Sequence, residues 1–308
     1  MVVDLALIAA GLVLLVAGGE FLVRGAVALA LRLGITPLVV GLTVVAFGTS
    51  APEMIVSVSA ALKGATDLAM GNVVGSNIAN VLVILGVSAL IAPIVTRGHD
   101  LRESWWMMVG ASVLLIALAL IGPLGLVAGL VLLAGLGMTL WRQLSTAGAD
   151  DTDLPEGTGL APWRNVAIWL AIGLISLPIG AHLLVQGATD IARAFGVSEA
   201  VIGLTLVAVG TSLPELAASV MAALRGRSDL ALGNVVGSNI FNILCILGIT
   251  ALIKPMPVPE QMLRLDFWVM LAAALILWPF LFRGQTIGRA AGVAMVAAYA
   301  AYVVVLLK

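Results

Sequence analysis

Charged residues are scarce in this chain of 308 residues. Asp, Glu, Lys and Arg make up only 10% of it, whereas 62% of the residues are hydrophobic and the mean hydropathy is +1.18. Because soluble domains carry about 25% charged residues, this composition excludes a protein that covers its surface with polar groups in water. It is typical of a protein surrounded by lipid, in which the 34 glycines allow helices to pack closely.

The residues that mark several other protein classes are also missing. No basic run indicates nucleic-acid binding, since the net charge is −1 and the arginines and lysines are scattered. Cys245 is the only cysteine, and His99 and His182 are the only histidines, so no zinc or copper motif and no intrachain disulfide is present. The apolar N-terminus carries Asp4 and no basic segment, which predicts a membrane helix rather than a cleaved signal peptide.

Apolar segments of roughly 20 residues, the length that crosses a bilayer, recur along the whole chain. They predict ten transmembrane helices at about 3–23, 37–62, 68–93, 105–121, 124–141, 165–188, 199–224, 230–253, 267–282 and 287–307. Only Gly122-Pro123 separates the fourth helix from the fifth. If this pair were a kink rather than a turn, the count would fall by one.

The basic residues of the loops predict the orientation of these helices. One side of the membrane receives ten of them: Arg24, Arg32, Arg97, Arg102, Arg142, Arg164, Arg225, Arg227, Arg283 and Arg289. The other side receives five: Lys63, Arg193, Lys254, Arg264 and Lys308. Since cytoplasmic loops carry the excess of Lys and Arg, the first side is predicted to be cytoplasmic and both termini to be extracellular or periplasmic.

One hydrophilic stretch, at about 144–163, divides the chain into residues 1–143 and 164–308. It contains four acidic residues, Asp150, Asp151, Asp153 and Glu156. These lack the spacing and the glycine of an EF-hand loop. The stretch is therefore predicted to be a cytoplasmic linker rather than a calcium-sensing site.

The two parts of the chain repeat each other. At an offset of 162 positions, 36–86 aligns with 198–248 without a gap and with 33 identities in 51 positions. Chance similarity between apolar helices would match Leu, Val and Ala, but here Gly-Thr-Ser-x-Pro-Glu occurs twice. Five spans in each part is an odd number, so the second repeat is inverted relative to the first, as in secondary transporters. The fold class is therefore an all-α polytopic membrane protein of two inverted five-helix repeats.

Each repeat places a glutamate, Glu53 or Glu215, near the middle of a span. A carboxylate at the bilayer centre costs about 2.5–3.5 kcal/mol on insertion scales and indicates a functional site. The preceding residues, Pro52 and Pro214, are predicted to interrupt the helices and to free backbone carbonyls. Carboxylates, carbonyls and hydroxyls together are the ligands of a hard cation such as Ca²⁺. The alternative is a pair of protonated, hydrogen-bonded core glutamates.

Further oxygen ligands are available on the neighbouring spans and beside the glutamates. Ser76 and Asn80 are one helical turn apart and share a face, and Ser238 and Asn242 repeat this spacing. The hydroxyls next to the glutamates belong to Thr49, Ser50, Thr211 and Ser212. We interpret these residues as ligands of a cation or as groups that orient its waters.

The segments GTSAPE and GTSLPE, each followed by GNVVGSNI, resemble the paired alpha-repeats of the cation/calcium exchanger superfamily. The resemblance covers essentially the whole chain and is nearest to the prokaryotic sodium/calcium exchangers. It implies ten helices in two inverted bundles of five and no soluble cofactor. It also implies alternating access, in which the first and sixth helices move across the core.

The same resemblance implies which residues bind the transported ions. The implied Ca²⁺ ligands are Glu53, Glu215 and the backbone of Thr49 and Thr211. The implied Na⁺ sites add the carbonyls of Ala46 and Ala208 and the side chains of Ser50, Ser212, Ser76 and Ser238. Many exchangers pair an asparagine with an aspartate where this sequence has Asn80 and Asn242. Coupling stoichiometry and the choice between Na⁺ and H⁺ therefore stay open.

The function expected from these features is Na⁺/Ca²⁺ antiport across the cell membrane, by a protein that works as a monomer and whose partners are inorganic cations and lipid. The alternatives are a Ca²⁺/H⁺ or Na⁺/H⁺ antiporter, a passive cation channel and an intramembrane enzyme. Inverted repeats favour a transporter over a channel. No nucleophile, metal motif or diphosphate motif accompanies the glutamates, which disfavours an enzyme.

Overall fold

The computed structural model of this chain describes residues 1–97, 101–146, 160–196 and 210–306. Within these ranges the protein is helical, and its only β pairings are two isolated bridges, between Ile94 and Ile287 and between Leu124 and Met256. The first part contains α1 (Val2–Leu33), α2 (Pro37–Val40), η1 (Gly41–Val45), α3 (Ala46–Thr49), α4 (Ala51–Leu62), α5 (Thr66–Ala79), η2 (Asn80–Leu85), α6 (Gly86–Ile91), α7 (Arg102–Ile121) and α8 (Leu126–Thr146). The second contains α9 (Trp163–Ala194), α12 (Leu213–Leu224), α13 (Ser228–Phe241), η4 (Asn242–Leu247), α14 (Gly248–Ile253), η5 (Met262–Asp266), α15 (Phe267–Ile276), α16 (Trp278–Arg283) and α17 (Arg289–Leu306).

Eight of the described helices, counted with their π-helical continuations, are long and apolar enough to cross a membrane. A ninth span is the pair 37–49 and 51–62, which is bent by 45° between α3 and α4. The structure describes the predicted seventh span, 199–224, only from residue 210 onward. This part contains the apolar helix α12. A turn separates α7 from α8, so Gly122-Pro123 is a helix boundary and not a kink.

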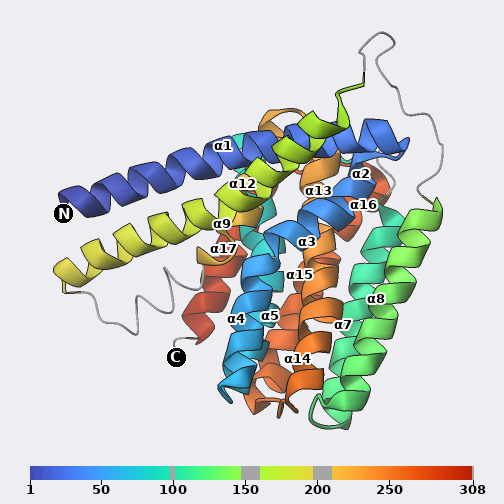
Figure 1. Cartoon of the computed structure of the whole chain (residues 1–308). Helices are drawn as coiled ribbons and strands as arrows, with labels where there is room; N and C mark the ends of the chain where they lie inside the picture. The colour runs from blue at the N-terminus through green and yellow to red at the C-terminus, as the bar shows by residue number, and fades with distance from the viewer. Residues whose placement is uncertain (98–100, 147–159, 197–209, 307–308) are drawn as a thin grey trace.

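The predicted limits of the first and sixth spans were wrong. The sequence predicted 3–23 and 165–188, but α1 and α9 contain 32 residues each. Such a helix is about 48 Å long at 1.5 Å per residue, which exceeds the hydrocarbon core of about 30 Å and requires a tilt. In Figure 1, α1 and α9 accordingly cross the other helices obliquely. Charged residues such as Arg24 do not end these helices, because a long side chain can reach the membrane surface from within a span.

Glycines at intervals of seven residues hold α1 and α9 against each other. They are Gly11, Gly18 and Gly25 on α1 and, at the offset of 162, Gly173, Gly180 and Gly187 on α9. A Cβ at Gly11 would lie 2.7 Å from the carbonyl oxygen of Gly180, and one at Gly180 would lie 2.9 Å from that of Gly11. Any side chain at this crossing would separate the two backbones, so α1 and α9 form one closely packed antiparallel pair.

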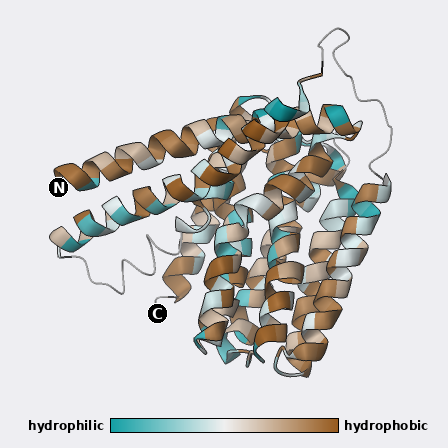
Figure 2. Cartoon of the chain, viewed as in Figure 1, coloured by the Kyte–Doolittle hydropathy of each residue, from teal (hydrophilic) through white to brown (hydrophobic). Residues whose placement is uncertain are grey.

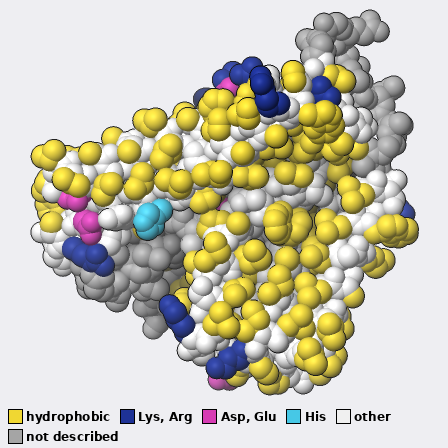
Figure 3. All heavy atoms as spheres, in the orientation of Figure 1, with side chains coloured by type: hydrophobic (Ala, Val, Ile, Leu, Met, Phe, Trp, Pro, Cys, Tyr) yellow, Lys and Arg dark blue, Asp and Glu magenta, His cyan; other side chains and the backbone are white. Residues whose placement is uncertain are grey.

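The repeated segments α5 and α13 lie inside the bundle and carry the polar residues of both repeats. Every residue of α13 is buried. Of the most apolar window of Ser228–Ile253, 83% is buried, against 22% for α1, so the former is central and the latter peripheral. Hydrophobic residues predominate along the helices (Figure 2), hydrophobic side chains cover much of the visible face, and Lys and Arg lie mainly at its edges (Figure 3). This distribution fits an apolar solvent around the middle of the protein.

Candidate cation site

The proline-glutamate segments interrupt their helices as the sequence predicted. Ser50 separates α3 from α4 with φ −81° and ψ 4°, and Ser212 precedes α12 with φ −90° and ψ 5°. Glu53 and Glu215 therefore lie in the first turns of new helices, where the positive end of the helix dipole favours a carboxylate. The break thus places each acidic group next to a residue with non-helical backbone angles.

Each glutamate is held by a serine of the opposite repeat. The hydroxyl of Ser50 donates to Oε1 of Glu215 at 3.0 Å, and the hydroxyl of Ser212 donates to Oε1 of Glu53 at 3.2 Å. Both glutamates are only 1% exposed. The second carboxylate oxygen, Oε2, of each glutamate is buried and has no hydrogen-bond partner. In each carboxylate, Oε1 is therefore held by a hydrogen bond, and Oε2 is available to bind another group.

Two asparagines position the backbones that carry the glutamates. The Nδ2 atom of Asn72 donates to the carbonyl oxygen of Glu53 at 3.2 Å and to the hydroxyl of Ser57 at 2.9 Å. Asn234 repeats both bonds in the second repeat, at 3.3 and 3.0 Å. The hydroxyl of Thr49 donates to Oδ1 of Asn234 at 3.1 Å, which joins the repeats. Asn72 and Asn234 thus hold helices together in both repeats.

Four further asparagines connect α5 and η2 with α13 and η4. Asn77 and Asn239 each donate to the backbone carbonyl of the other at 3.2 Å. Asn80 donates through Nδ2 to Oδ1 of Asn239 at 2.9 Å, and Asn242 donates to Oδ1 of Asn77 at 3.0 Å. Asn80 and Asn242 are also the first residues of π-helical segments, which occur frequently at functional sites. Their nitrogens are thus used in the protein, while their Oδ1 atoms are left without a partner.

Five buried oxygens of the candidate site lack a hydrogen-bond partner: Oε2 of Glu53 and Glu215, Oδ1 of Asn80 and Asn242, and Oγ of Ser238. A buried polar atom without a partner costs about 1–3 kcal/mol. Ionised carboxylate and amide oxygens can only accept hydrogen bonds, so their complement is a donor or a cation. Oxygen atoms of this kind are the ligands of Ca²⁺ and of other hard cations. The described residues contain no cluster of three or more His, Cys, Asp and Glu side chains, so the charge of the site comes from the two glutamates.

The remaining predicted residues differ in how far the structure describes them. Ala46, Thr49 and Ser76 are buried, at 0%, 1% and 6% exposure. Thr211 is half-buried beside Ser212. Ala208 lies outside the described residues. Ser57 and Ser219, which bind the two positioning asparagines, were not predicted from the sequence, although the recurrence of a serine four residues after each glutamate could have indicated them.

Known proteins match this chain over its whole length. The family described as "Sodium/calcium exchanger protein" matches residues 3–144 and 165–308. This chain belongs to the sodium/calcium exchanger family. Sodium/calcium exchanger MaX1 of Methanosarcina acetivorans is 35% identical to this exchanger over 336 residues, with 96% of each chain covered. Inner membrane protein YrbG of Escherichia coli is 37% identical over 324 residues, covering 99% of this chain and 97% of YrbG.

A solved structure confirms the relationship at the level of the fold. The sodium-calcium exchanger NCX_Mj, soaked with zero Na⁺ and Ca²⁺, matches with a TM-score of 0.87 and 32% identity, and 99% of each chain is covered. The protein is therefore a multi-pass cell-membrane exchanger of inorganic cations with an NCX_Mj-like fold, and not an enzyme. The resemblance stated from GTSAPE, GTSLPE and GNVVGSNI is confirmed.

Proposed function

We propose that this exchanger moves Ca²⁺ in one direction and Na⁺ in the other through the site between Glu53 and Glu215. The observation that carries the proposal is the set of five buried, unpartnered oxygens described above. The two glutamates contribute a charge of −2, which one Ca²⁺ or two Na⁺ neutralise. The NCX_Mj and MaX1 relatives, both named as sodium/calcium exchangers, support Na⁺ as the coupling ion.

Within this proposal, the ligands are those of the sequence prediction. Ca²⁺ binds the carboxylates of Glu53 and Glu215 and the backbone of Thr49 and Thr211. The Na⁺ sites use the carbonyls of Ala46 and Ala208 and the hydroxyls of Ser50, Ser212, Ser76 and Ser238, and the amide oxygens of Asn80 and Asn242 bind a cation or orient its waters. The unpartnered Oδ1 atoms of Asn80 and Asn242 and the unpartnered hydroxyl of Ser238 support their place in this set.

The proposal includes the topology that alternating access requires. Ten transmembrane helices form two inverted repeats, residues 1–143 and 164–308, with 144–163 as a cytoplasmic linker and both termini outside. The serine–glutamate bonds that run in both directions between the repeats support a pseudo-two-fold axis through the site. Both halves of the site belong to one chain, which supports a functional monomer.

Proteoliposomes loaded with Na⁺ test the coupling ion. We expect an outward Na⁺ gradient to drive ⁴⁵Ca²⁺ uptake, and a pH gradient alone to drive none. If three Na⁺ leave for each Ca²⁺, one positive charge leaves per cycle, and 100 mV changes the driving force by about 2.3 kcal/mol. A potential clamped positive inside with K⁺ and valinomycin should then accelerate uptake. Uptake driven by a pH gradient and insensitive to Na⁺ would replace Na⁺/Ca²⁺ exchange with proton-coupled antiport.

Single cysteines in a Cys245→Ala background test the topology. Gly226→Cys, in the turn between α12 and α13, and Ala149→Cys, in the linker, are both predicted to react with an impermeant thiol reagent from the cytoplasmic side. Val2→Cys, at an exposed position, should react from the opposite side. Reaction of positions 226 and 149 from different sides would contradict the inverted arrangement.

A further inference from the structure

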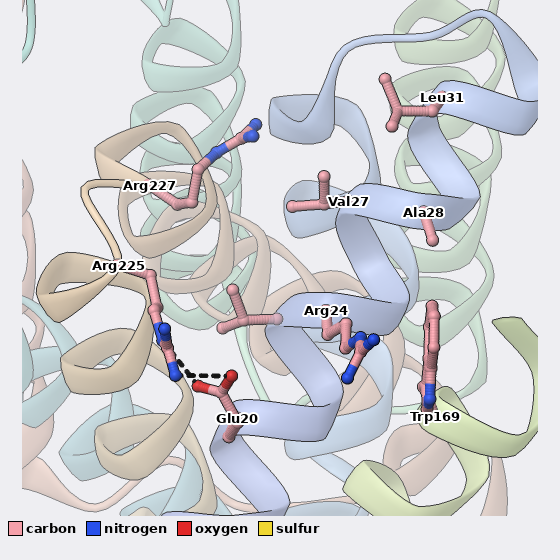
Figure 4. Close-up of a pocket in the computed structure, with 9 residues that line it drawn as sticks. Glu20, Arg24, Val27, Ala28, Leu31, Trp169, Arg225 and Arg227 are labelled. Atoms are coloured by element: carbon pink, nitrogen blue, oxygen red, sulfur yellow. Dashed lines mark hydrogen bonds and ion pairs between the residues drawn. The ribbon is translucent and has the colours of Figure 1, made fainter. Parts of the chain in front are cut away.

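A pocket of about 370 Å³ lies between α1, α9 and the turn that joins α12 to α13 (Figure 4), and neither Glu53 nor Glu215 lines it. Its charged lining consists of Glu20, Arg24, Arg225 and Arg227, and Trp169 of α9 closes one side. All three arginines belong to the group that the loop charges assigned to one side of the membrane. The pocket therefore gathers basic residues from two separate parts of the chain, α1 and the turn between α12 and α13.

The charges around this pocket do not cancel. Both terminal oxygens of Glu20 accept from Arg225 at 2.7 Å, and Arg227 binds the two carboxylate oxygens of Asp229 at 3.1 and 2.7 Å. Arg24 makes no ion pair with a described residue, and its guanidinium lies 4.1 Å from the centre of the Trp169 ring. Three positive and two negative groups leave a net charge of +1, which a monoanion would neutralise.

Donors for such an anion remain on each arginine. A guanidinium carries five N–H groups, and a two-bond contact with a carboxylate leaves three of them for another acceptor. Arginine binds phosphate through parallel N–H···O bonds in the same way as it binds carboxylate. The charge and the donors together match the single negative charge of a phosphodiester.

The rest of the lining is apolar and continues along a helix that faces lipid. Val27 and Leu31 are one turn apart on the wall formed by α1, and the neighbouring residues Val23 and Ala28 also line the pocket. An arginine stacked on a tryptophan is typical of the membrane–water interface. We propose that the pocket binds the phosphate group of an anionic phospholipid, with the lipid's acyl chain against α1. The proposal requires the membrane location of the family but does not depend on which ions are exchanged.

Native mass spectrometry of the purified full-length protein tests this site in the absence of any ion gradient. The probes are phosphatidylglycerol, the zwitterionic phosphatidylcholine and soluble glycerol 3-phosphate. We expect phosphatidylglycerol to bind at least tenfold more tightly than phosphatidylcholine. In the double variant Arg24→Gln/Arg227→Gln this preference should disappear, because each charged hydrogen bond is worth about 1.5–3 kcal/mol, or roughly tenfold or more in affinity.

Arg283→Gln is the matched control. The guanidinium of Arg283 also lies over a tryptophan, 5.6 Å from the ring centre of Trp278, but it does not line this pocket. It should keep the wild-type preference, and the melting temperatures of all variants in phosphatidylcholine should agree, which shows that they are folded. If phosphatidylglycerol binds and glycerol 3-phosphate does not, the pocket is a lipid site. If both bind equally, the pocket recognises the phosphate group alone. No preference in the wild type, or equal losses in the double variant and the control, would overturn the proposal.

Discussion

The two repeats make equivalent contacts at the centre of this exchanger, but their long helices, α1 and α9, do not contact the core in equivalent ways. At the centre, the serine–glutamate contacts of one repeat have their counterparts in the other: Ser50 binds Glu215 as Ser212 binds Glu53, at 3.0 and 3.2 Å. The asparagine bonds agree to within about 0.1 Å between repeats. Under the proposed alternating access, this equivalence would allow the site to bind the same ions from either side.

In the middle turns of α1 and α9 the equivalence is lost. Glu20 of α1 forms an ion pair with Arg225, but the positions related to them by the offset of 162 are His182 of α9 and Lys63. Histidine cannot offer lysine a negative charge, so no ion pair can form there. The two repeats therefore differ in what can hold a long helix against the core.

The packing of the long helices shows the same asymmetry. A Cβ at Gly19 of α1 would lie 2.7 Å from Cγ of Met221 and 3.0 Å from the carbonyl oxygen of Ala217, so α1 is closed onto α12. Among the described residues, α9 makes no comparable contact with α4, and Ile55, the counterpart of Ala217, is 64% exposed. The two long helices are thus packed unequally against the core, although the centre is symmetric.

The largest expected effect comes from removing either half of the symmetric centre. Glu53→Gln or Glu215→Gln should each lower ⁴⁵Ca²⁺ uptake in proteoliposomes by at least a hundredfold and by similar factors. Loss of one charge at about 4 Å from a cation weakens the attraction by about 4 kcal/mol per unit charge at an effective dielectric constant of about 20.

Glu260→Gln is the control for these two variants, because Glu260 is a surface glutamate paired with Arg264 and should leave uptake unchanged. Substantial uptake by one glutamine variant but not the other would show that the two halves of the site are not equivalent. Near-normal uptake by both would remove the glutamates from the ion site.

A smaller effect is expected where the symmetric centre gains a charge. In Asn242→Asp, an ionised aspartate loses the 3.0 Å donation from Nδ2 to Asn77, and the third carboxylate changes the ionic charge that the site can neutralise. We expect uptake to become dependent on pH or on a different Na⁺ stoichiometry. Asn80→Asp makes the same change at the related position, and voltage, pH and Na⁺ dependence should be measured for both. Curves that coincide with those of the wild type would show that these positions do not set coupling.

Most of the fold could be predicted from the sequence, because apolar segments and an internal repeat are local signals. The limits of α1 were wrong because an arginine within a long tilted helix is indistinguishable in sequence from one in a loop. The π-helical segments that begin at Asn80 and Asn242 could not be predicted either. A π-helix has i→i+5 hydrogen bonds and a wider turn than an α-helix. We attribute this wider turn to packing between the repeats, which the propensity of a single apolar segment does not reveal.

The site was predicted in composition but not in its internal bonds. Glu53 and Glu215 were identified because a duplicated carboxylate in an apolar span is costly. Which oxygen remains free could not be inferred from residue types, since it depends on where Ser50 and Ser212 place their protons across the repeats. The difference between Glu20 and His182 was visible in the sequence, but its meaning required the ion pair with Arg225.

Removing that ion pair should have a modest effect on the populations of the two states. The side chains of Arg225 and Glu20 are 57% and 34% exposed, and pairs of this kind contribute about 0.2–1 kcal/mol. Glu20→Gln should therefore shift the equilibrium by at most about fivefold away from the state in which α1 covers α12. Ala217→Cys, in a Cys245→Ala background, reports this shift as a faster reaction with a water-soluble thiol reagent. An unchanged rate, with Glu260→Gln as control, would show that the ion pair does not hold α1.

The smallest expected effect comes from giving α9 the carboxylate that it lacks at position 182. His182→Glu gives Lys63 a carboxylate partner in the state where α9 closes onto α4, and both side chains are exposed, so we expect a gain of less than about fivefold in that state. The reaction of Ala217→Cys should again become faster, since α1 leaves α12 when α9 closes. His182→Gln separates the charge from the loss of histidine and should have no effect. The double variant His182→Glu/Lys63→Gln decides the cause, because a double-mutant cycle isolates the pair from its separate substitutions. If the faster reaction persists without Lys63, the new carboxylate acts through another group, and the pairing of positions 182 and 63 does not shift the balance between the two states.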